Sequence, residues 1–330
     1  MKKTKIDLEQ AWKKIFLEHE TPASFNVWVK NFALNLNKIW EESSARELDP
    51  SITNQRVKKN IAVVIGRGPS LKKYNHLEML AKSSIDATIV CSDGALISAL
   101  KAGVTPDKFQ NFFVATIDPR EDTRKFYDDK IVDSFGHKIK GIFATVSNPD
   151  TVERARLAGI KPYWIHTLVD YNEGKKSFNN ISAIMTRARK HVDGLPAIQT
   201  GGNVGTSAWF ISWQILKCQN VVLLGINHGW EEDDPLDKIM THNYTNKLLD
   251  IDKKSVTFRK LFPKVYNPHF DCHVILDPIF QYYSSAFKEF IERAPSWVKT
   301  VNATEGGAIF GNRIDCIRFG EFLKQHTDNS

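Results

Sequence analysis

The sequence has little cysteine and no long apolar run, and each absence excludes a class of protein. Its 330 residues include four cysteines (Cys91, Cys218, Cys272 and Cys316), none of them in a CxxC pair. So few thiols exclude a small disulfide scaffold and predict buried, reduced side chains in a cytoplasmic protein. No stretch of about 18 uncharged apolar residues is present, which argues against a membrane-spanning helix. The start MKKTKIDLEQAWKKIF lacks the apolar region of a signal peptide.

Composition places the chain among ordinary globular proteins, because 42% of its residues are hydrophobic and 25% are charged. The 45 Lys and Arg against 38 Asp and Glu give a formal charge of +7. Two interpretations stay open: a surface rich in lysine, or an anionic partner such as a phosphate-bearing small molecule. Nucleic acid is disfavoured, because the basic residues are scattered rather than arranged in a stripe. A homo-oligomer is compatible with the sequence.

The hydrophobic pattern divides the chain into three parts. Residues 1–59 are expected to form an N-terminal helical cap, with Trp28 and Phe32 on one helical face. Residues 60–230 alternate short apolar runs with helix-like segments, which predicts a Rossmann-like, doubly wound α/β core with a mainly parallel sheet. Residues 231–330 are expected to be a C-terminal addition of helix and strand. The predicted strands are 61–66, 87–92, 112–118, 140–146, 161–166, 221–226 and 298–304.

The first candidate site is Gly66-Arg67-Gly68-Pro69-Ser70-Leu71, directly after the first strong strand. Glycines there let the backbone approach a phosphate, and N–H groups at the start of the following helix can bind the anion. Ser70 adds a hydroxyl and Arg67 a positive charge. The alternative is a plain strand-to-helix turn, since Leu71 stands where a GxGxxG motif has its third glycine.

Two acidic residues follow the next strands. Asp93, followed by Gly94, ends the second strand, where an acid commonly binds ribose hydroxyls. The alternative is that this segment caps the next helix. Asp118 follows the third strand, where it could hold Mg²⁺ or substrate.

Three glycines in five residues mark a second candidate anion-binding turn. Gly201, Gly202, Asn203 and Gly205 precede an apolar helix. A glycine-rich turn into a helix N-terminus can hold an anion, and Asn203 can donate to a base, sugar or carboxylate. We therefore expect ligand contact at this turn.

Two histidines lie beyond the strand at 221–226. His228 and His242 are candidates for a general base that activates a hydroxyl, because the pKa of histidine is near neutral. The alternative for each is a structural or surface histidine. His242 is the preferred base and His228 the second. The spacing of His269 and His273 alone does not predict zinc, because structural zinc needs four ligands.

Taken together, these motifs resemble the MptE-like family, named for an archaeal 6-hydroxymethylpterin diphosphokinase. The resemblance rests on GRGPSL (66–71), SDGA (92–95), Gly103-x-x-Pro106-Asp107, GGNVG (201–205) and, for the motility-accessory-factor glycosyltransferases of this family, NATEGG (302–307). It covers roughly residues 60–230 and implies a core similar to bacterial sialyltransferases that use CMP-linked donors.

The two branches of the family imply different chemistry. The diphosphokinase branch implies ATP and Mg²⁺, with a pyrophosphoryl group transferred to a pterin, and carries an acidic cluster of the form Thr-Asp-Leu-Asp-Gly. Here the matching place reads Thr116-Ile117-Asp118-Pro119-Arg120, so a single carboxylate is kept. The glycosyltransferase branch implies a nucleotide-sugar donor such as a CMP-sugar and a hydroxyl acceptor on a glycan or protein.

We therefore predict a nucleotide-dependent transferase, with glycosyl transfer from a nucleotide-activated donor as the leading hypothesis. The alternatives are the ATP- and Mg²⁺-dependent pterin diphosphokinase and a nucleotide-binding module without catalysis. Asp118 is the tentative metal ligand.

Overall fold

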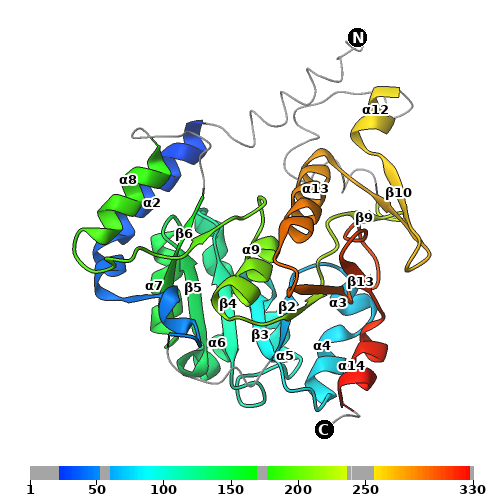
Figure 1. Ribbon diagram of the computed structural model, residues 1–330, viewed down its shortest axis with the longest axis horizontal. Helices are drawn as coiled ribbons and strands as arrows, with labels where there is room; N and C mark the ends of the chain where they lie inside the picture. Colours follow the sequence, from blue (N-terminus) through cyan, green and yellow to red (C-terminus); the bar gives the residue numbers. More distant parts are fainter. Residues whose placement is uncertain (1–21, 53–59, 169–176, 236–238, 240–255, 328–330) are drawn as a thin grey trace.

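A large parallel sheet forms the centre of the molecule. The computed structural model describes residues 22–52, 60–168, 177–235, 239 and 256–327. Nine strands follow one another in the order β1-β6-β5-β4-β3-β2-β8-β12-β13, and the short strand β7 pairs with β6 (Figure 1). Every pairing in this sheet is parallel. The predicted Rossmann-like α/β class is therefore confirmed.

The seven predicted strands all lie in this sheet, at nearly the predicted positions. Strands β3 and β4 are buried at every residue, which explains why their sequences are continuous apolar runs rather than alternating ones. The strands of the sheet are β1 Ser43–Ser44, β2 Ile61–Ile65, β3 Thr88–Ser92, β4 Phe112–Thr116, β5 Lys140–Ala144, β6 Lys161–Thr167, β7 Ala197–Ile198, β8 Asn220–Leu224, β12 Lys299–Asn302 and β13 Ile314–Cys316.

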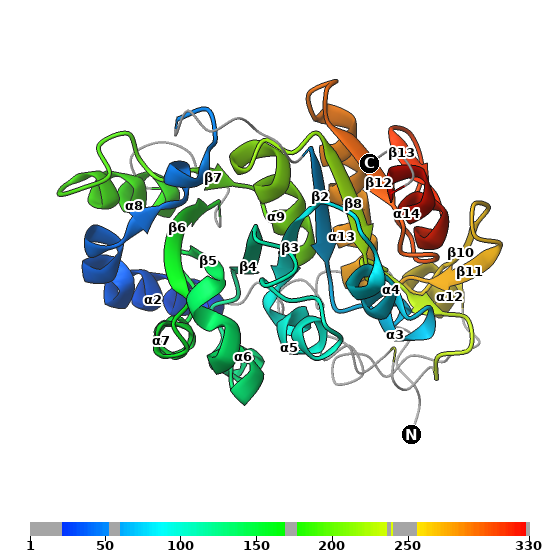
Figure 2. The same ribbon diagram turned by 90° about the horizontal axis from the view of Figure 1, so that it is seen from below.

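Helices cover both faces of the sheet. The chain runs outward from β2 to β6 in one direction and then returns to add β8 on the other side of β2. Because crossovers between parallel strands are right-handed, the reversal places the helix before β8 on the opposite face. Figure 2 shows this arrangement, with α9 on one face and α5, α6 and α7 on the other.

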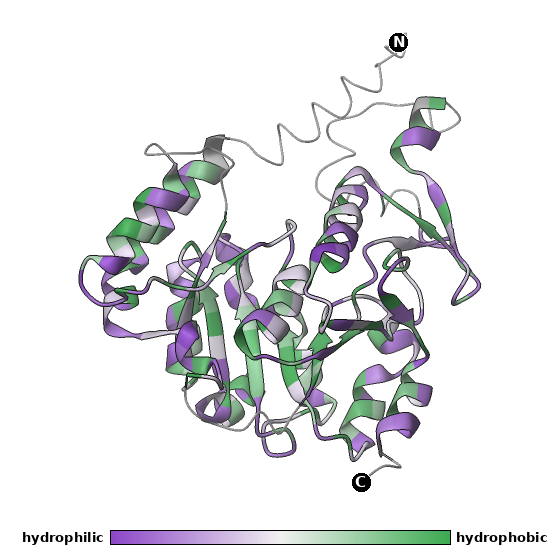
Figure 3. Ribbon diagram, viewed as in Figure 1, coloured by the Kyte–Doolittle hydropathy of each residue, from purple (hydrophilic) through white to green (hydrophobic). Residues whose placement is uncertain are grey.

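The helices at the surface carry both apolar and polar positions, green and purple in Figure 3, as amphipathic helices do. Among the described helices, none is long and apolar enough to span a bilayer. Their bounds are α2 Pro22–Glu41, η1 Ala45–Leu48, α3 Ser70–Lys73, α4 His76–Lys82, α5 Asp93–Lys101, η2 Glu121–Phe126, α6 Lys130–Phe135, η3 Gly136–Lys138, α7 Pro149–Leu157, α8 Phe178–Arg187, α9 Val204–Phe210, η5 Ile211–Ile215, α12 Val256–Leu261, α13 Pro278–Arg293 and α14 Phe319–Thr327.

Two asparagines attach α2 to the loops at the carboxyl ends of β4 and β5. Asn31 donates from Nδ2 to the carbonyls of Pro119 and Val146, at 2.8 and 3.1 Å. Asn35 donates to the carbonyls of Thr145 and Ser147, at 3.2 and 2.8 Å. Both asparagines are buried, so these amides satisfy loop carbonyls that water does not reach.

Replacing Asn35 by Ala is expected to lower the free energy of unfolding by about 3 kcal/mol, because two buried carbonyls lose their donor. Chemical denaturation measures the change. Asn37→Ala is the matched control, since Asn37 is exposed on the same helix and should change stability little. Equal stability of both variants would contradict this role for Asn35.

The region after residue 230 contains a second sheet whose strands are not among those predicted from the sequence. β9 Trp230–Glu231, β10 Lys264–Asn267 and β11 Cys272–Ile275 form this separate antiparallel sheet in the order β10-β11-β9. Two-residue and four-residue strands with polar positions are too short to give a period-2 signal. All four cysteines are free, and the prediction of burial holds fully for Cys91 and Cys218, while the other two are half-buried.

Candidate functional site

The carboxyl ends of β2 and β8 meet where the strand order reverses. The Gly66 amide donates to the Leu224 carbonyl, and the Gly68 amide donates to the Gly225 carbonyl, each at 2.8 Å. The loops after β3, β4 and β12 leave from the same edge of the sheet, because all these strands are parallel. In open α/β folds this reversal is where ligands bind.

The glycine turn after β2 is packed against the loop after β8. A Cβ at Gly68 would lie 1.9 Å from Oδ1 of Asn227 and 2.6 Å from the Gly225 carbonyl oxygen. Ser70 is fully buried, and its hydroxyl donates to the same Asn227 oxygen at 3.0 Å. The tight approach of two loops therefore accounts for these residues, and their contact with phosphate stays a prediction. Helix α3 is a single turn, so the helix that follows the glycine turn is shorter than the sequence pattern suggests.

Asp93 is a buried acid at the start of α5. Its Oδ1 accepts a hydrogen bond from the Gly94 amide at 2.6 Å, and its Oδ2 has no hydrogen-bond partner among the described residues. Burial raises the pKa of Asp93 to about 7, and the nearby carboxylate of Asp118 adds to the shift. The Gly94 amide, the Thr116 hydroxyl and Arg67 oppose it. A carboxyl group with an unsatisfied oxygen at a strand's carboxyl end is suited to accept hydroxyl groups of a ligand.

The Arg67 side chain lies across the start of α5. Its Cδ would be 2.9 Å from a Cβ at Gly94, and its guanidinium lies 5.3 Å from the ring centroid of Phe126. The glycine at position 94 thus makes room for an exposed arginine beside Asp93. A positive charge therefore lies next to Asp93, the candidate hydrogen-bond acceptor for ribose hydroxyls.

Asp118 is paired with an arginine two residues away. Arg120 Nη2 lies 2.6 Å from Asp118 Oδ2, and Arg120 Nε lies 3.0 and 3.1 Å from the two carboxylate oxygens. Because both oxygens contact the guanidinium, a metal would have to displace Arg120 to bind there. Within the described part of the chain, no group of three or more His, Cys, Asp or Glu side chains could hold a metal ion.

The second glycine turn leads into α9, which continues as the π-helical segment η5. Asn203 is the N-cap, and its Oδ1 accepts from the Thr206 amide at 2.9 Å. Gly201 and Gly202 have φ values of 53° and 83°, which favour glycine, and a Cβ at Gly202 would lie 2.2 Å from the Tyr283 ring. Gly205 packs against Ile226 in the same way. The turn is therefore covered by α13 from the C-terminal addition.

His228 is buried between this turn and α13. Its Nε2 lies 3.3 Å from Oδ1 of Asn203, and because an amide oxygen can only accept, the ring donates from Nε2. Its Nδ1 then holds the lone pair and has no partner among the described residues. Burial, and secondarily Lys288, lowers the pKa of His228 to about 3. Such a ring is neutral at physiological pH and accepts a proton poorly. His242, the preferred base, lies outside the described residues.

Two contacts of the site are absent from the sequence prediction. Asn227 connects the loops after β2 and β8, and Tyr283 on α13 covers Gly202. The pairing of Asn227 with Ser70 spans 157 positions, so no local pattern reveals it. The sequence gives a partial signal for Tyr283: the aromatic face of α13 predicts that this helix packs against the core, but not that Tyr283 contacts Gly202.

Comparisons with known proteins agree with this architecture. The family model described as "6-hydroxymethylpterin diphosphokinase MptE-like" matches residues 30–233, more than half of the chain. Among solved structures, the chain is similar to the MAf glycosyltransferase from Magnetospirillum magneticum AMB-1, with a TM-score of 0.51 and 15% identity. The alignment covers 82% of this chain and 36% of that one, and at this identity it shows a shared fold alone. No curated protein matches the chain. The family match shows that this chain belongs to the MptE-like family.

Proposed function

We propose that this chain is a nucleotide-dependent transferase that moves a glycosyl group from a nucleotide-activated donor, such as a CMP-sugar, to an acceptor hydroxyl. The observation that carries the proposal is Asp93, a buried carboxyl group with an unsatisfied oxygen beside the glycine turn at the strand reversal. A nucleotide there would supply ribose hydroxyls to Asp93 and phosphate to the backbone and cations nearby.

The cations beside Asp93 suit a leaving phosphate. Arg67 and Arg120 both lie at the carboxyl ends of the strands, and Arg120 is held in place by Asp118. In glycosyl transfer, the acceptor oxygen forms a bond to the anomeric carbon while the bond from that carbon to the phosphate oxygen breaks. The electron pair goes to the phosphate, where fixed positive charge stabilises it.

The acceptor hydroxyl loses its proton in the same reaction. We propose His242 as the base that takes this proton, because the low pKa of His228 makes His228 a weak base. His228 instead orients the Asn203 side chain at the start of α9. Gly66, Gly68, Ser70, Gly201, Gly202 and Gly205 would shape the turns around the donor, as the sequence indicates.

Diphosphoryl transfer from ATP to a pterin is the second candidate, favoured by the description of the matching family. It would use Mg²⁺ between the nucleotide phosphates and carboxylates. The engagement of both Asp118 oxygens by Arg120 makes this place a poor two-carboxylate site and places this candidate second.

A thermal-shift panel of CMP, UDP, GDP, ATP and a pterin, each with and without Mg²⁺, separates the candidates. We expect CMP to raise the melting temperature without Mg²⁺, because a ligand at about 100 times its dissociation constant adds about 2.7 kcal/mol of stability. A shift that requires ATP, Mg²⁺ and pterin together would support the diphosphokinase. Nucleotide stabilisation without turnover over a broad acceptor panel would indicate a binding module.

A further inference from the structure

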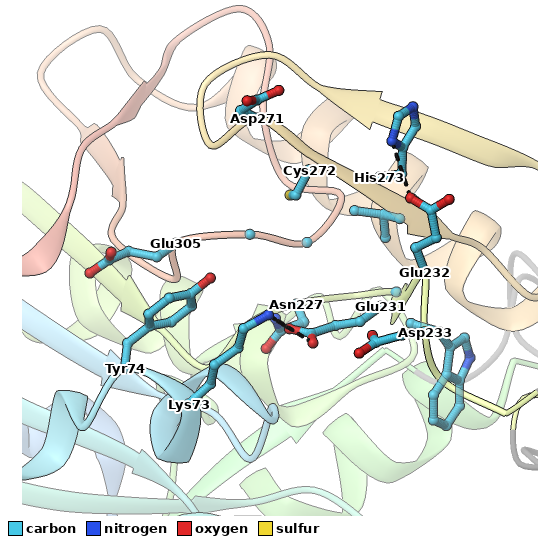
Figure 4. Close-up of a pocket in the computed structure, with 15 residues that line it drawn as sticks. Lys73, Tyr74, Asn227, Glu231, Glu232, Asp233, Asp271, Cys272, His273 and Glu305 are labelled. Carbon is cyan, nitrogen blue, oxygen red and sulfur yellow. Dashed lines mark hydrogen bonds and ion pairs between the residues drawn. The ribbon is translucent and has the colours of Figure 1, made fainter.

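A cavity lies beside the proposed donor site and has a different chemistry. It has a volume of about 220 Å³ and lies between the loop after β8, the β9–β11 sheet and the loop after β12. Figure 4 shows the Lys73–Glu231 ion pair on one side of this cavity and Cys272 on the other. None of the donor-site residues predicted from the sequence lines it.

The cavity is negatively charged in a protein that is positive as a whole. Its lining includes five carboxylates against one lysine, so with His273 neutral its formal charge is −4, compared with +7 for the chain. Two neighbouring groups respond to this charge. The pKa of Lys73 is raised, first by its hydrogen bond to Glu231 and further by Asp233. The pKa of Cys272 is raised mainly by burial; Lys73 opposes the shift, and Glu231 and Asp271 add to it.

Four of these carboxylates have hydrogen-bond partners among the described residues, and the fifth, Asp233, has none there. Both Glu231 oxygens accept from Lys73 at 2.9 Å, and Asp271 accepts from the hydroxyl of Tyr266 at 2.8 Å. Asp233 is exposed and has no hydrogen bond or ion pair with any other described residue. Lys73 offsets the charge of Glu231 and Lys264 that of Glu232, so Asp233, Asp271 and Glu305 line the cavity without a lysine or arginine partner among the described residues.

Aromatic and amide groups complete the lining. Tyr74 and Trp230 line the cavity with aromatic rings, and Lys73 Nζ lies 5.5 Å from the Tyr74 ring centroid. Electron-rich ring faces attract a cation and pack against sugar carbons. Asn227 supplies an amide and also accepts from Ser70 in the glycine turn after β2. This one residue joins the cavity to the proposed donor site, so a molecule in the cavity lies next to the donor.

We propose that this cavity binds the acceptor, and that the acceptor is a small hydroxylated molecule that carries an amine and no acid group, such as an amino sugar. The role of this molecule as the acceptor rests on the proposed transferase function, whereas the binding of an amine in the cavity does not depend on that function. An anionic acceptor is excluded by like-charge repulsion from the carboxylates of the lining.

Three sugars of similar shape, glucosamine, glucose and glucuronate, test whether the cavity prefers a positively charged ligand and rejects a negatively charged one. Their binding to the full chain is measured by calorimetry without nucleotide, below neutral pH, where the amine is protonated. We expect glucosamine to bind best, glucose more weakly and glucuronate not at all. Added salt should weaken glucosamine binding, because charge attraction at a partly exposed site is screened.

Variants place the binding in the cavity. Asp233→Asn should weaken glucosamine about threefold to fivefold, the size of a partly exposed ion pair. Glu231→Gln should weaken it about tenfold, because it also leaves the Lys73 cation unpaired beside the amine. Glu289→Gln is the matched control: its carboxylate is exposed on α13 and pairs with Arg293, outside the cavity.

The outcomes separate this inference from the proposed function. Equal binding of the three sugars, preference for glucuronate, or unchanged binding in both cavity variants would overturn the inference even if CMP stabilises the protein. Charge-dependent glucosamine binding without any nucleotide stabilisation would keep the cavity as an amine site and reject the transferase proposal.

Discussion

Replacing Asp93 by Asn is expected to raise the free energy of unfolding by up to about 4 kcal/mol near pH 8 and to change it little near pH 4. The pKa of this acid is about 7 in the folded protein and near 3.8 in the unfolded chain. Between these values the unfolded chain ionises Asp93 while the folded protein keeps it protonated. Stability is therefore lost as pH rises from about 4 to about 7, and the asparagine removes this loss.

Urea denaturation at several pH values measures the effect. The difference between the variant and the wild type should grow with pH and level off above about pH 7. Asp315→Asn is the control, because Asp315 is exposed on β13 and its replacement should give no comparable gain. A constant or negative difference for Asp93→Asn over this range would show that the buried acid is not destabilising.

The same variant should bind nucleotide more weakly. A carboxylate that accepts ribose hydroxyls makes charge-assisted hydrogen bonds, and an amide in its place should weaken nucleotide binding about tenfold. A variant that is more stable but binds less is expected where a protein keeps a costly group for function. Unchanged nucleotide affinity together with higher stability would assign Asp93 a purely structural role.

Replacing Gly68 by Ala is expected to lower the free energy of unfolding by about 2 kcal/mol and to abolish measurable nucleotide stabilisation. The new Cβ would meet Asn227 Oδ1 at 1.9 Å and the Gly225 carbonyl oxygen at 2.6 Å. The Asn227 side chain can move away only by losing its bond to Ser70, and the carbonyl belongs to the backbone after β8. Both sides of the strand reversal would therefore shift.

Gly320→Ala provides the matched control for this variant. Gly320 lies in α14, where a Cβ would approach only the flexible end of Met79, at 3.2 Å. Alanine favours helix over glycine by about 1 kcal/mol, so this change should be neutral or stabilising. Denaturation and the CMP thermal shift measure both variants. Full stability and binding in Gly68→Ala would mean that the two loops separate without cost.

The sequence predicts the sheet well because its strands are buried on both faces. The run Ile61–Ile65 is apolar at each position, and so is most of β4, so these segments are recognisable without any knowledge of their neighbours. The short strands β9 and β13 carry no such signal, because pairing with a partner strand, rather than their own composition, makes them strands.

The candidate site was predictable as a set of positions but not as a set of roles. Glycines and an acid after parallel strands had to lie at one edge of the sheet, which is a consequence of topology. The role of Ser70 depends on Asn227, 157 positions away, and that of Asp118 depends on which way Arg120 turns. Hydrogen-bond partners of this kind are chosen by packing, which a linear pattern does not contain.

The sequence by itself determined the class of the protein, because its repeated apolar runs are those of buried parallel strands. Its few, unpaired cysteines indicated free thiols, and its glycines after the strands indicated a glycine-lined strand reversal. Only the tertiary structure decided the protonation behaviour of Asp93 and His228, since burial sets the pKa of each. It also decided that Lys73, Tyr74 and Asn227 meet residues after 230 around an acidic cavity, because the lining of that cavity comes from separate segments of the chain.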